Sequence, residues 1–557
     1  MKIKNILKRT LQVIVLVSII STSLFASKDT FTPNKNYEIL LNFFRDVNLY
    51  YVDTVDTEKL LMQATGAMTK NLDPYTTFIP EKDMADFEFM TTGKYGGMGA
   101  IIRQKGDYVI IAEPYKGFPA DKAKLEIGDK ILEIDGADAK GYSTEKVSSL
   151  LKGEPGTKFT LKVEKAFTGE EKEMKITRER ITISGVTFYT LLPDSTAYIL
   201  LSDFTQDCSE DMKNAFYSLK KQGATSLIID LRNNGGGLLQ EAVKILSMFT
   251  PKGTEVVSMR GKTKSVNEVF KTKDDPIDLE IPITVLVNKN SASASEIVSG
   301  ALQDLDRAVL VGQRTFGKGL VQNTRHLGYN SYLKVTTAKY YIPSGRCIQA
   351  LDYSHRDQDG RAENVPDSLI SEFKTSAGRR VYDGGGVTPD IKIEKDKNST
   401  FSMIVYAKGY IDDFVAEYFK TNPQRVIPQL GYKLSDSEYA EFVSFMADKD
   451  VQWESATKKA INTLKKQARD EDFIDIIDEQ IKAMESKLSQ DKKLSLDINK
   501  DELIELIENQ IILQKHYRNG VIASSLSSDK EIIKAQEVLK NSKLYNKYLS
   551  NTKDPIK

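Results

Sequence analysis

The hydrophobic pattern changes along the chain, and each change indicates a different kind of structure. Over residues 31–90, apolar residues recur every three or four positions, as in amphipathic helices. Over 91–182, short alternating runs stand between glycines and other turn formers, which is typical of strands. Over 185–395, near-continuous apolar runs alternate with helical patterns, and 396–557 is charged with single apolar helix faces. We therefore predict four regions.

The first region, 31–90, is expected to be helical and to serve as a structural cap. One helix should carry apolar residues such as Ile39 and Phe43 at helical spacing, and a second should run from Thr57 to Lys70. The turn-forming stretch Asn71-Leu-Asp-Pro-Tyr75 should end it.

The second region, 91–182, is predicted to be a small, mostly β module. The helix near Ser143 to Leu151 has Ser143 as its N-cap. A module whose glycine loop opens a strand can accept a peptide as an added strand, with the peptide carboxylate on backbone N–H groups. The predicted strands are Tyr108–Ala112, Lys130–Ile134, Phe159–Val163 and Glu173–Thr177.

The third region, 185–395, is predicted to be an α/β domain with helices covering a mostly parallel sheet. Ligand sites in such sheets lie beyond the carboxyl ends of the strands. Gly235–Gly237 and Ser291–Ser295 both fall at such ends. The predicted elements are strands Ala197–Leu201, Ser226–Leu231, Ile283–Val287 and Ala308–Gly312, and helices Asp207–Gln222, Leu238–Phe249 and one from Ser293.

The fourth region, 396–557, shows helix faces but no chemistry. Phe473, Ile477 and Ile481 lie on one such face. A structural, substrate-cradling or dimerising domain would fit equally well.

The N-terminus has the features of a secretory signal peptide over residues 1–26. Met1–Arg9 is basic, Leu11–Phe25 is mostly apolar, and the small residue Ala26 follows. We predict cleavage and export; retention as a membrane anchor is the alternative, although the apolar run is short for a span.

Composition excludes several kinds of function. Lys+Arg and Asp+Glu both number 78, so net charge offers no argument for nucleic-acid binding. The two cysteines, Cys208 and Cys347, are not a disulfide framework, and we expect free, buried thiols. With three histidines the chain cannot hold a His-rich metal site, and no metal or cofactor is predicted.

The candidate chemistry is a serine hydroxyl activated by a lysine. A lysine can act as the base if burial lowers its pKa from about 10.4 by several units. Lys318 lies between two glycines and apolar neighbours, and Gln322 would share its face on a strand. The residues alone do not choose among Ser291, Ser293 and Ser295, and a helix-capping serine would also fit.

Two resemblances make these predictions specific. Tyr95–Ala100 (YGGMGA), Pro119-Ala120 and Ile127–Gly136 (IGDKILEIDG) resemble a PDZ domain, which implies that Gly97, Met98 and Gly99 bind a peptide carboxylate. Three further motifs resemble the carboxyl-terminal processing, or tail-specific, serine proteases, and the likeness covers roughly residues 36–395. These motifs are Asp230–Leu239 (DLRNNGGGLL), Asn290–Asp304 (NSASASEIVSGALQD) and Gly312–Gln322 (GQRTFGKGLVQ).

The protease resemblance implies a role for each site residue. Ser293 would be the nucleophile, Lys318 the general base 25 residues later, and Gln322 the third member of a triad. The oxyanion hole would use the N–H groups of Ala294 and Gly236, although Gly235 stands where relatives often carry proline. Segments such as Tyr341–Gln349 resemble longer Gram-negative members, which implies a periplasmic location.

The resemblance also implies polypeptide C-termini as partners, with an adaptor protein and a second copy of the chain as further candidates. A catalytically dead PDZ scaffold and a serine hydrolase that uses His326 are the competing hypotheses.

Overall fold

The computed structural model describes residues 28–550, except 395–397, 452–455 and 489–490. The predicted signal peptide therefore lies outside the described residues. Within those ranges, no helix is both long and apolar enough to cross a bilayer. The chain divides into two compact units, Met1–Ile79 with Thr324–Val335, and Pro80–Asn323 with Thr336–Lys557, which we describe separately.

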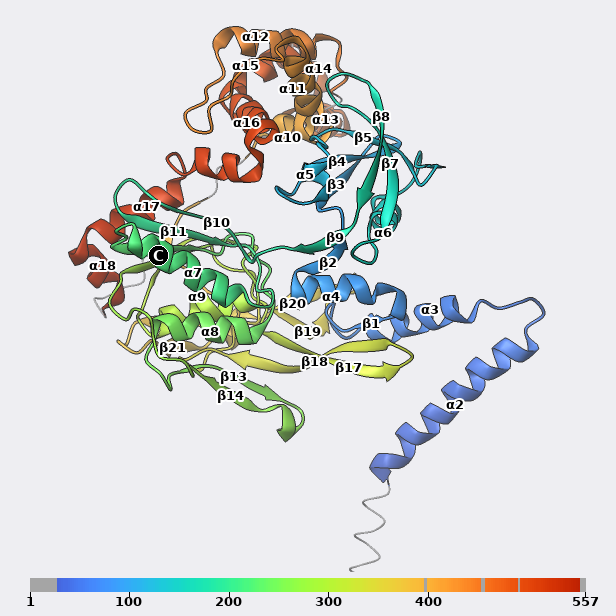
Figure 1. Ribbon diagram of the computed structural model, residues 1–557, viewed down its shortest axis with the longest axis vertical. Coiled ribbons are helices and arrows are strands. Elements are labelled where there is room, and N and C mark those ends of the chain that lie inside the picture. Colours follow the sequence, from blue (N-terminus) through green and yellow to red (C-terminus); the bar gives the residue numbers. More distant parts are fainter. Residues whose placement is uncertain (1–27, 395–397, 452–455, 489–490, 551–557) are drawn as a thin grey trace, which may run out of the picture. The chain divides into compact units, whose positions relative to one another are not determined.

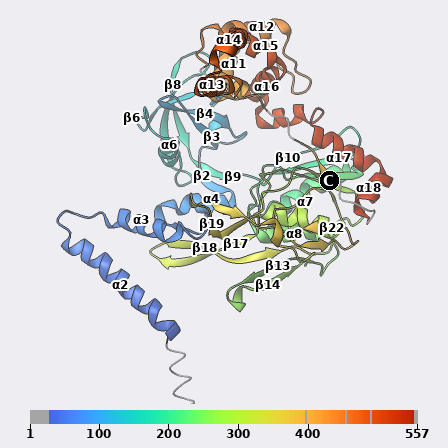
Figure 2. The same cartoon turned by 180° about the vertical axis from the view of Figure 1, so that it is seen from behind.

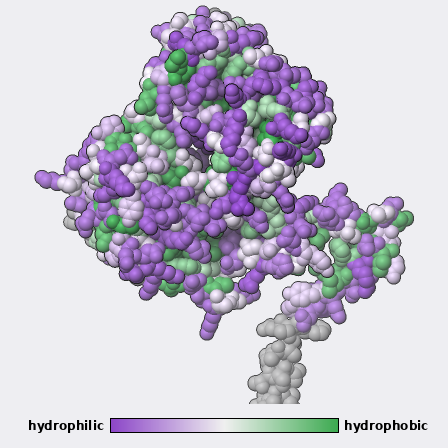
Figure 3. Space-filling model, in the orientation of Figure 1, coloured by the Kyte–Doolittle hydropathy of each residue, from purple (hydrophilic) through white to green (hydrophobic). Residues whose placement is uncertain are grey.

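The first unit contains the two predicted helices, α2 (Lys28–Tyr50) and α3 (Thr57–Thr69). The Asp56 carboxylate caps α3 by accepting a hydrogen bond from the Lys59 N–H at 3.0 Å. A strand that the helical pattern did not predict, β1 (Thr77–Ile79), pairs antiparallel with 332–334. Large apolar side chains are exposed on this unit, as Figure 3 shows for one face.

The PDZ-like module of the second unit follows the predicted strand pattern. Its sheet has the order β3-β4-β5-β7-β8, with β6 beside β5, while β2 pairs with β9 and so joins the start of the module to its end. Ser143 caps the helix α6, as predicted. The strands are β2 (Lys94–Gly97), β3 (Ala100–Lys105), β4 (Tyr108–Pro114), β5 (Lys130–Ile134), β6 (Ala137–Asp138), β7 (Lys158–Glu164), β8 (Glu171–Thr177) and β9 (Glu179–Thr182), and the helices are α4 (Met84–Thr92), α5 (Pro119–Lys122) and α6 (Thr144–Leu151).

The α/β core is built on one sheet of order β10-β11-β12-β15-β16-β23 (Figure 1). Its strands are parallel except β10, which pairs antiparallel with β11, so the expected mostly parallel sheet is confirmed. Every residue of β12 and β15 is buried, as expected for strands covered on both faces. The strands are β10 (Val186–Leu191), β11 (Thr196–Leu201), β12 (Ser226–Asp230), β15 (Ile283–Val287), β16 (Val309–Gly312) and β23 (Ile391–Lys392).

Different helices cover the two faces of this sheet. Ile199 and Ile229 pack with α7 (Cys208–Lys221), α8 (Leu239–Phe249) and α9 (Ala294–Asp304). Their neighbours Tyr198 and Ile228 point to the other face and pack against the last two helices, α17 (Lys530–Lys540) and α18 (Ser542–Leu549). Figure 2 shows α17 and α18 from behind, next to β10.

Smaller strands complete the core around the sheet. In the second unit, β13 pairs antiparallel with β14 and with the end of β18. These strands are β13 (Glu255–Gly261), β14 (Glu268–Lys271), β17 (Leu320–Gly328), β18 (Ser331–Tyr341), β19 (Leu351–Arg356), β20 (Ala362–Asn364), β21 (Glu372–Lys374) and β22 (Arg380–Tyr382).

The C-terminal region is helical, as predicted, but its last two helices belong to the packing of the core sheet. The other helices have an apolar core of their own, to which Leu503, Ile507 and Ile511 contribute. The packing of the core sheet therefore includes residues beyond 396, because α17 buries Ile532 and Val538 on it. The helices of this region that precede α17 are α10 (Thr400–Ala407), α11 (Tyr410–Thr421), α12 (Asp436–Phe445), α13 (Ala456–Asp470), α14 (Ile474–Leu488), α15 (Asp491–Ile498) and α16 (Lys500–Ser525).

Candidate active site

The three serines of the SASAS run have different environments. The Ser291 hydroxyl donates to the Leu231 carbonyl at 2.7 Å, and the Ser295 hydroxyl donates to the Asn234 carbonyl at 2.9 Å; both residues are fully buried. Ser293 is half-buried and directly precedes α9. Its backbone has φ 57° and ψ −114°, a conformation that residues other than glycine rarely adopt. Two hydroxyls therefore brace a neighbouring loop, and Ser293 is the one available for chemistry.

The start of α9 presents an N–H group beside this serine. Within the described residues, the Ala294 N–H donates to no acceptor, whereas Ser295 and Glu296 donate to the carbonyls of Ala292 and Ser293. The first-turn N–H groups of a helix favour negative charge. The Ala294 N–H is therefore positioned for a developing oxyanion.

Gly236 lies against Ser293 but its N–H has a partner. A Cβ on Gly236 would stand 2.7 Å from the Ser293 Cβ, at a φ of +100°, so only glycine fits there. Its N–H donates to the Asn234 Oδ1 at 2.8 Å. For Gly236 to serve an oxyanion, Asn234 must share or release this N–H, a feature that the motif alone did not indicate.

Lys318 lies in the loop that precedes β17. We expected Lys318 and Gln322 on one strand, but β17 begins at Leu320, so that expectation is wrong. The loop leaves the ladder because side chains, rather than a neighbouring strand, accept its N–H groups from Gly317 to Gly319. The Gly317 and Lys318 N–H groups donate to Glu296, and Gly317 has a φ of +87°.

The Glu296 carboxylate links the two motifs. Its Oε2 accepts the N–H groups of Ser293 and Lys318, each at 2.9 Å. Its Oε1 accepts the Gly317 N–H at 2.7 Å and the Thr315 hydroxyl at 2.6 Å. Burial raises the pKa of this fully buried carboxyl, and the four donors oppose that rise. One side chain thus holds the backbones of both the candidate nucleophile and the candidate base.

Tyr340 makes a second link between them. Its hydroxyl lies within hydrogen-bond distance of the Ser293 carbonyl, at 3.1 Å, and of the Lys318 carbonyl. The ring is almost fully buried. The sequence analysis identified neither Tyr340 nor Glu296. The glutamate had a signal, since it ends the SASASE stretch, whereas the tyrosine had none.

Gln322 and the three histidines each contact a neighbouring residue, and these contacts bear on their predicted roles. The Gln322 Nε2 donates to the Thr336 Oγ1 at 3.1 Å. The His326 ring packs against Tyr332, His355 pairs with Asp352, and His516 bonds the Ile427 carbonyl. These contacts give no support to a histidine base.

The predicted carboxylate loop of the PDZ-like module lies between β2 and β3. Met98 is buried, and Gly99 has a φ of +72° with its Cα close to Phe118, where a Cβ would stand 2.6 Å from the Phe118 Cβ. Strand β3 ends the order of this sheet among the described strands, and α6 lies beside it. An added peptide strand could therefore lie between β3 and α6.

Comparison with known proteins agrees with this arrangement. Residues 195–353 match the model of Peptidase family S41, and residues 110–165 match a PDZ domain. Residues 401–539 match "Probable PDZ-protease, C-terminal helical domain".

Individual relatives are similar over most of the chain. A "Probable CtpA-like serine protease" of Staphylococcus aureus (strain COL) is 30% identical over 434 residues, which is 77% of this chain and 78% of that protein. A "Carboxy-terminal-processing protease" of Bartonella bacilliformis is 34% identical over 342 residues, 60% of this chain and 78% of that protein. Among solved structures, a photosystem II D1 C-terminal processing protease is 29% identical, with 64% of this chain and 92% of that one covered at a TM-score of 0.34.

Proposed function

Because the chain belongs to peptidase family S41 and is a serine-type peptidase of the carboxy-terminal processing group, we propose that Ser293 is its nucleophile and Lys318 its general base. The observation that carries this proposal is the Glu296 carboxylate, whose Oε2 accepts the N–H of both residues. Ser293 lies three positions before Glu296, and Lys318 lies 22 positions after it. Because one buried side chain binds the backbones of both, it keeps them in one fixed arrangement.

The mechanism uses one lysine twice. Neutral Lys318 takes the proton from the Ser293 hydroxyl as its oxygen attacks the peptide carbonyl, and the resulting ammonium protonates the leaving amine. The Ala294 N–H stabilises the oxyanion, with a second donor from the glycine run at Gly236; one such donor contributes about 3 kcal/mol. Water then hydrolyses the acyl-enzyme, with Lys318 again as base. Gln322, held by Thr336, orients the lysine.

The PDZ module provides the specificity for substrate tails. A C-terminal carboxylate would accept hydrogen bonds from the N–H groups of Gly97, Met98 and Gly99, while the peptide pairs as an added strand with the edge of β3. The substrates are exported proteins, and the enzyme acts in the periplasm after removal of residues 1–26. N-terminal sequencing of the mature protein tests the cleavage step, and a start at Met1 would contradict it.

A peptidase assay tests the catalytic proposal directly. The substrate is an internally quenched peptide with a free C-terminus that the full-length chain cleaves. Ser293→Ala should abolish turnover. Lys318→Arg should do so as well, because arginine keeps the charge but does not deprotonate. Full cleavage by either variant would refute the Ser293–Lys318 pair, and loss of activity in His326→Ala alone would favour a histidine base.

The same peptide with an amidated C-terminus tests the role of the PDZ module. Capture of a free carboxylate predicts a higher KM for the amide with little change in kcat. Equal KM values for the two peptides would show that the module does not bind the carboxylate.

A further inference from the structure

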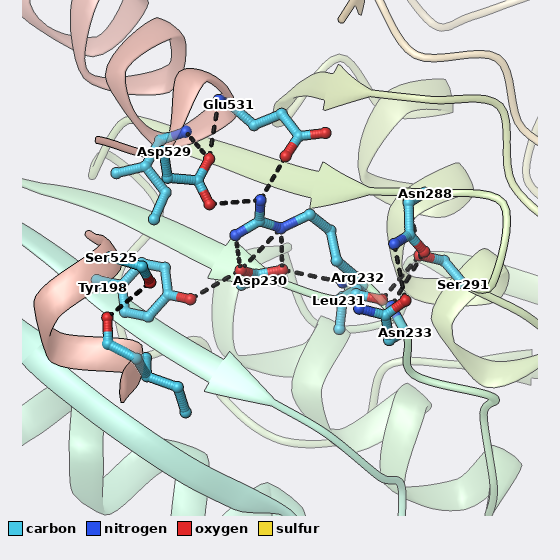
Figure 4. Close-up of polar contacts among 12 residues, drawn as sticks. Tyr198, Asp230, Leu231, Arg232, Asn233, Asn288, Ser291, Ser525, Asp529 and Glu531 are labelled. Carbon is cyan, nitrogen blue, oxygen red and sulfur yellow. Dashed lines mark hydrogen bonds and ion pairs between the residues drawn. The ribbon is translucent and has the colours of Figure 1, made fainter. Parts of the chain in front are cut away.

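Arg232, in the loop after β12, joins the catalytic core to the last part of the chain. Its guanidinium bonds Asp230 through Nε and Nη2, the latter at 2.5 Å. Its Nη1 bonds Asp529 at 2.7 Å and also Glu531, both at the start of α17 (Figure 4). All four side chains are largely buried. Arg232 is thus held on one side by Asp230 and on the other by two residues of α17 that lie almost 300 positions later in the chain.

Asp529 has two functions at this point. Its Oδ1 accepts the Glu531 and Ile532 N–H groups at 2.9 and 3.1 Å and so caps α17. Its Oδ2 binds Arg232. Because one carboxylate does both, the contact to Arg232 is formed only when α17 is folded in this place. The apolar face of α17 fixes that place, since Ile532, Ala535 and Val538 are buried on the sheet.

The loop that Arg232 anchors, residues 231–236, is hydrogen-bonded to residues 288–292, which precede Ser293. The Leu231 carbonyl accepts a hydrogen bond from the Ser291 hydroxyl, and the Asn233 Oδ1 accepts one from the Asn288 side-chain amide at 3.0 Å (Figure 4). The same oxygen accepts a hydrogen bond from the Asn290 side-chain amide, also at 3.0 Å. The Asn234 carbonyl accepts the Ala292 N–H at 3.0 Å. Movement of Arg232 would therefore shift the residues on both sides of Ser293.

We propose that α17 is a positioning element of the proteolytic centre, in which Asp529 and Glu531 hold Arg232 and, through it, the loop 231–236 beside Ser293. This inference rests on the proposed role of Ser293. Three carboxylates, those of Asp230, Asp529 and Glu531, surround one guanidinium. Loss of the two helix carboxylates leaves the Asp230–Arg232 pair intact, whereas loss of Arg232 would leave three buried negative charges.

The test is therefore the Asp529→Asn/Glu531→Gln double variant of the full-length chain, assayed with the quenched peptide. Asparagine still caps the helix, so α17 should remain folded. We expect kcat to fall about tenfold with KM within twofold, because the loop is mispositioned while substrate binding is unchanged.

Two control variants separate positioning from stability. Lys540→Met removes a different ion pair between α17 and the core, that with Asp194 at 3.2 Å, which does not touch the loop. Val405→Ala weakens the separate apolar core of the C-terminal helices, in which Val405 is fully buried. At temperatures well below their Tm values, both variants should have the kcat of the unmodified chain, and Val405→Ala should lower Tm.

The outcomes distinguish the two proposals. A double variant with kcat within twofold of the unmodified chain would overturn the positioning role, as would an equal loss of kcat in Val405→Ala. If Ser293→Ala still cleaves the peptide, the proposed function itself fails. If Ser293→Ala is inactive and the double variant is fully active, only the role of α17 fails.

Discussion

Replacement of Glu296 tests how the catalytic loops are held together. The carboxylate accepts four hydrogen bonds in a site without solvent exposure. Alanine would leave all four donors without an acceptor. At about 1–3 kcal/mol for each stranded donor, Glu296→Ala should lower the free energy of unfolding by roughly 4 kcal/mol or more.

Glutamine should be much less harmful, for a reason specific to this geometry. Its single oxygen can take the place of Oε2 and keep the bonds to Ser293 and Lys318. Its amide nitrogen then takes the place of Oε1 and donates to the Thr315 hydroxyl oxygen, so only the Gly317 N–H and the Thr315 O–H lose their acceptor. With two stranded donors in place of four, the expected cost is roughly 2 kcal/mol or more, about half that of alanine.

Turnover should follow the same order. Glu296→Ala releases both the Ser293 and the Lys318 backbones, so kcat should fall by about a hundredfold, while Glu296→Gln should stay within about tenfold. Urea unfolding gives the free energies, and peptide cleavage by the folded variants gives kcat. The reasoning is refuted if folded Glu296→Ala keeps kcat within threefold of the unmodified chain, or if glutamine costs as much as alanine.

Three further predictions concern single residues. Tyr340→Phe removes the hydroxyl that contacts the Ser293 and Lys318 carbonyls, so kcat should fall about three- to tenfold with little change in Tm. An unchanged kcat would show that this hydroxyl does not position the two residues. Gly236→Ala places a Cβ 2.7 Å from the Ser293 Cβ at a positive φ, and peptide cleavage should fall by about a hundredfold or more. Burial raises the pKa of the Cys208 and Cys347 thiols, so little thiolate exists at neutral pH and iodoacetamide should label neither in the folded chain; rapid labelling detected by mass spectrometry would contradict this.

Local pattern and motif spacing were enough to predict the main elements of the PDZ-like module and of the core sheet. Alternation and apolar runs located strands such as Lys130–Ile134 and Ile283–Val287 at their observed bounds, because side-chain burial repeats with the period of the element. The free state of both cysteines was also expected, although Cys347 is only half-buried. Motif resemblance separated Ser293 from two other serines, and the structure supplies a reason in the backbone bonds of Ser291 and Ser295.

The sequence did not reveal the contacts that hold the catalytic loops in place. The four-residue spacing suggested that Lys318 and Gln322 share one strand face, yet Glu296 takes the Lys318 N–H and keeps it out of the ladder. The charged, helical pattern of 396–557 did not show that α17 packs on the core sheet. Hydrogen bonds such as that from Arg232 to Asp529 join residues distant in the sequence. Periodicity records only whether a side chain is buried, and the partner of a buried polar group is decided by which segments meet in space.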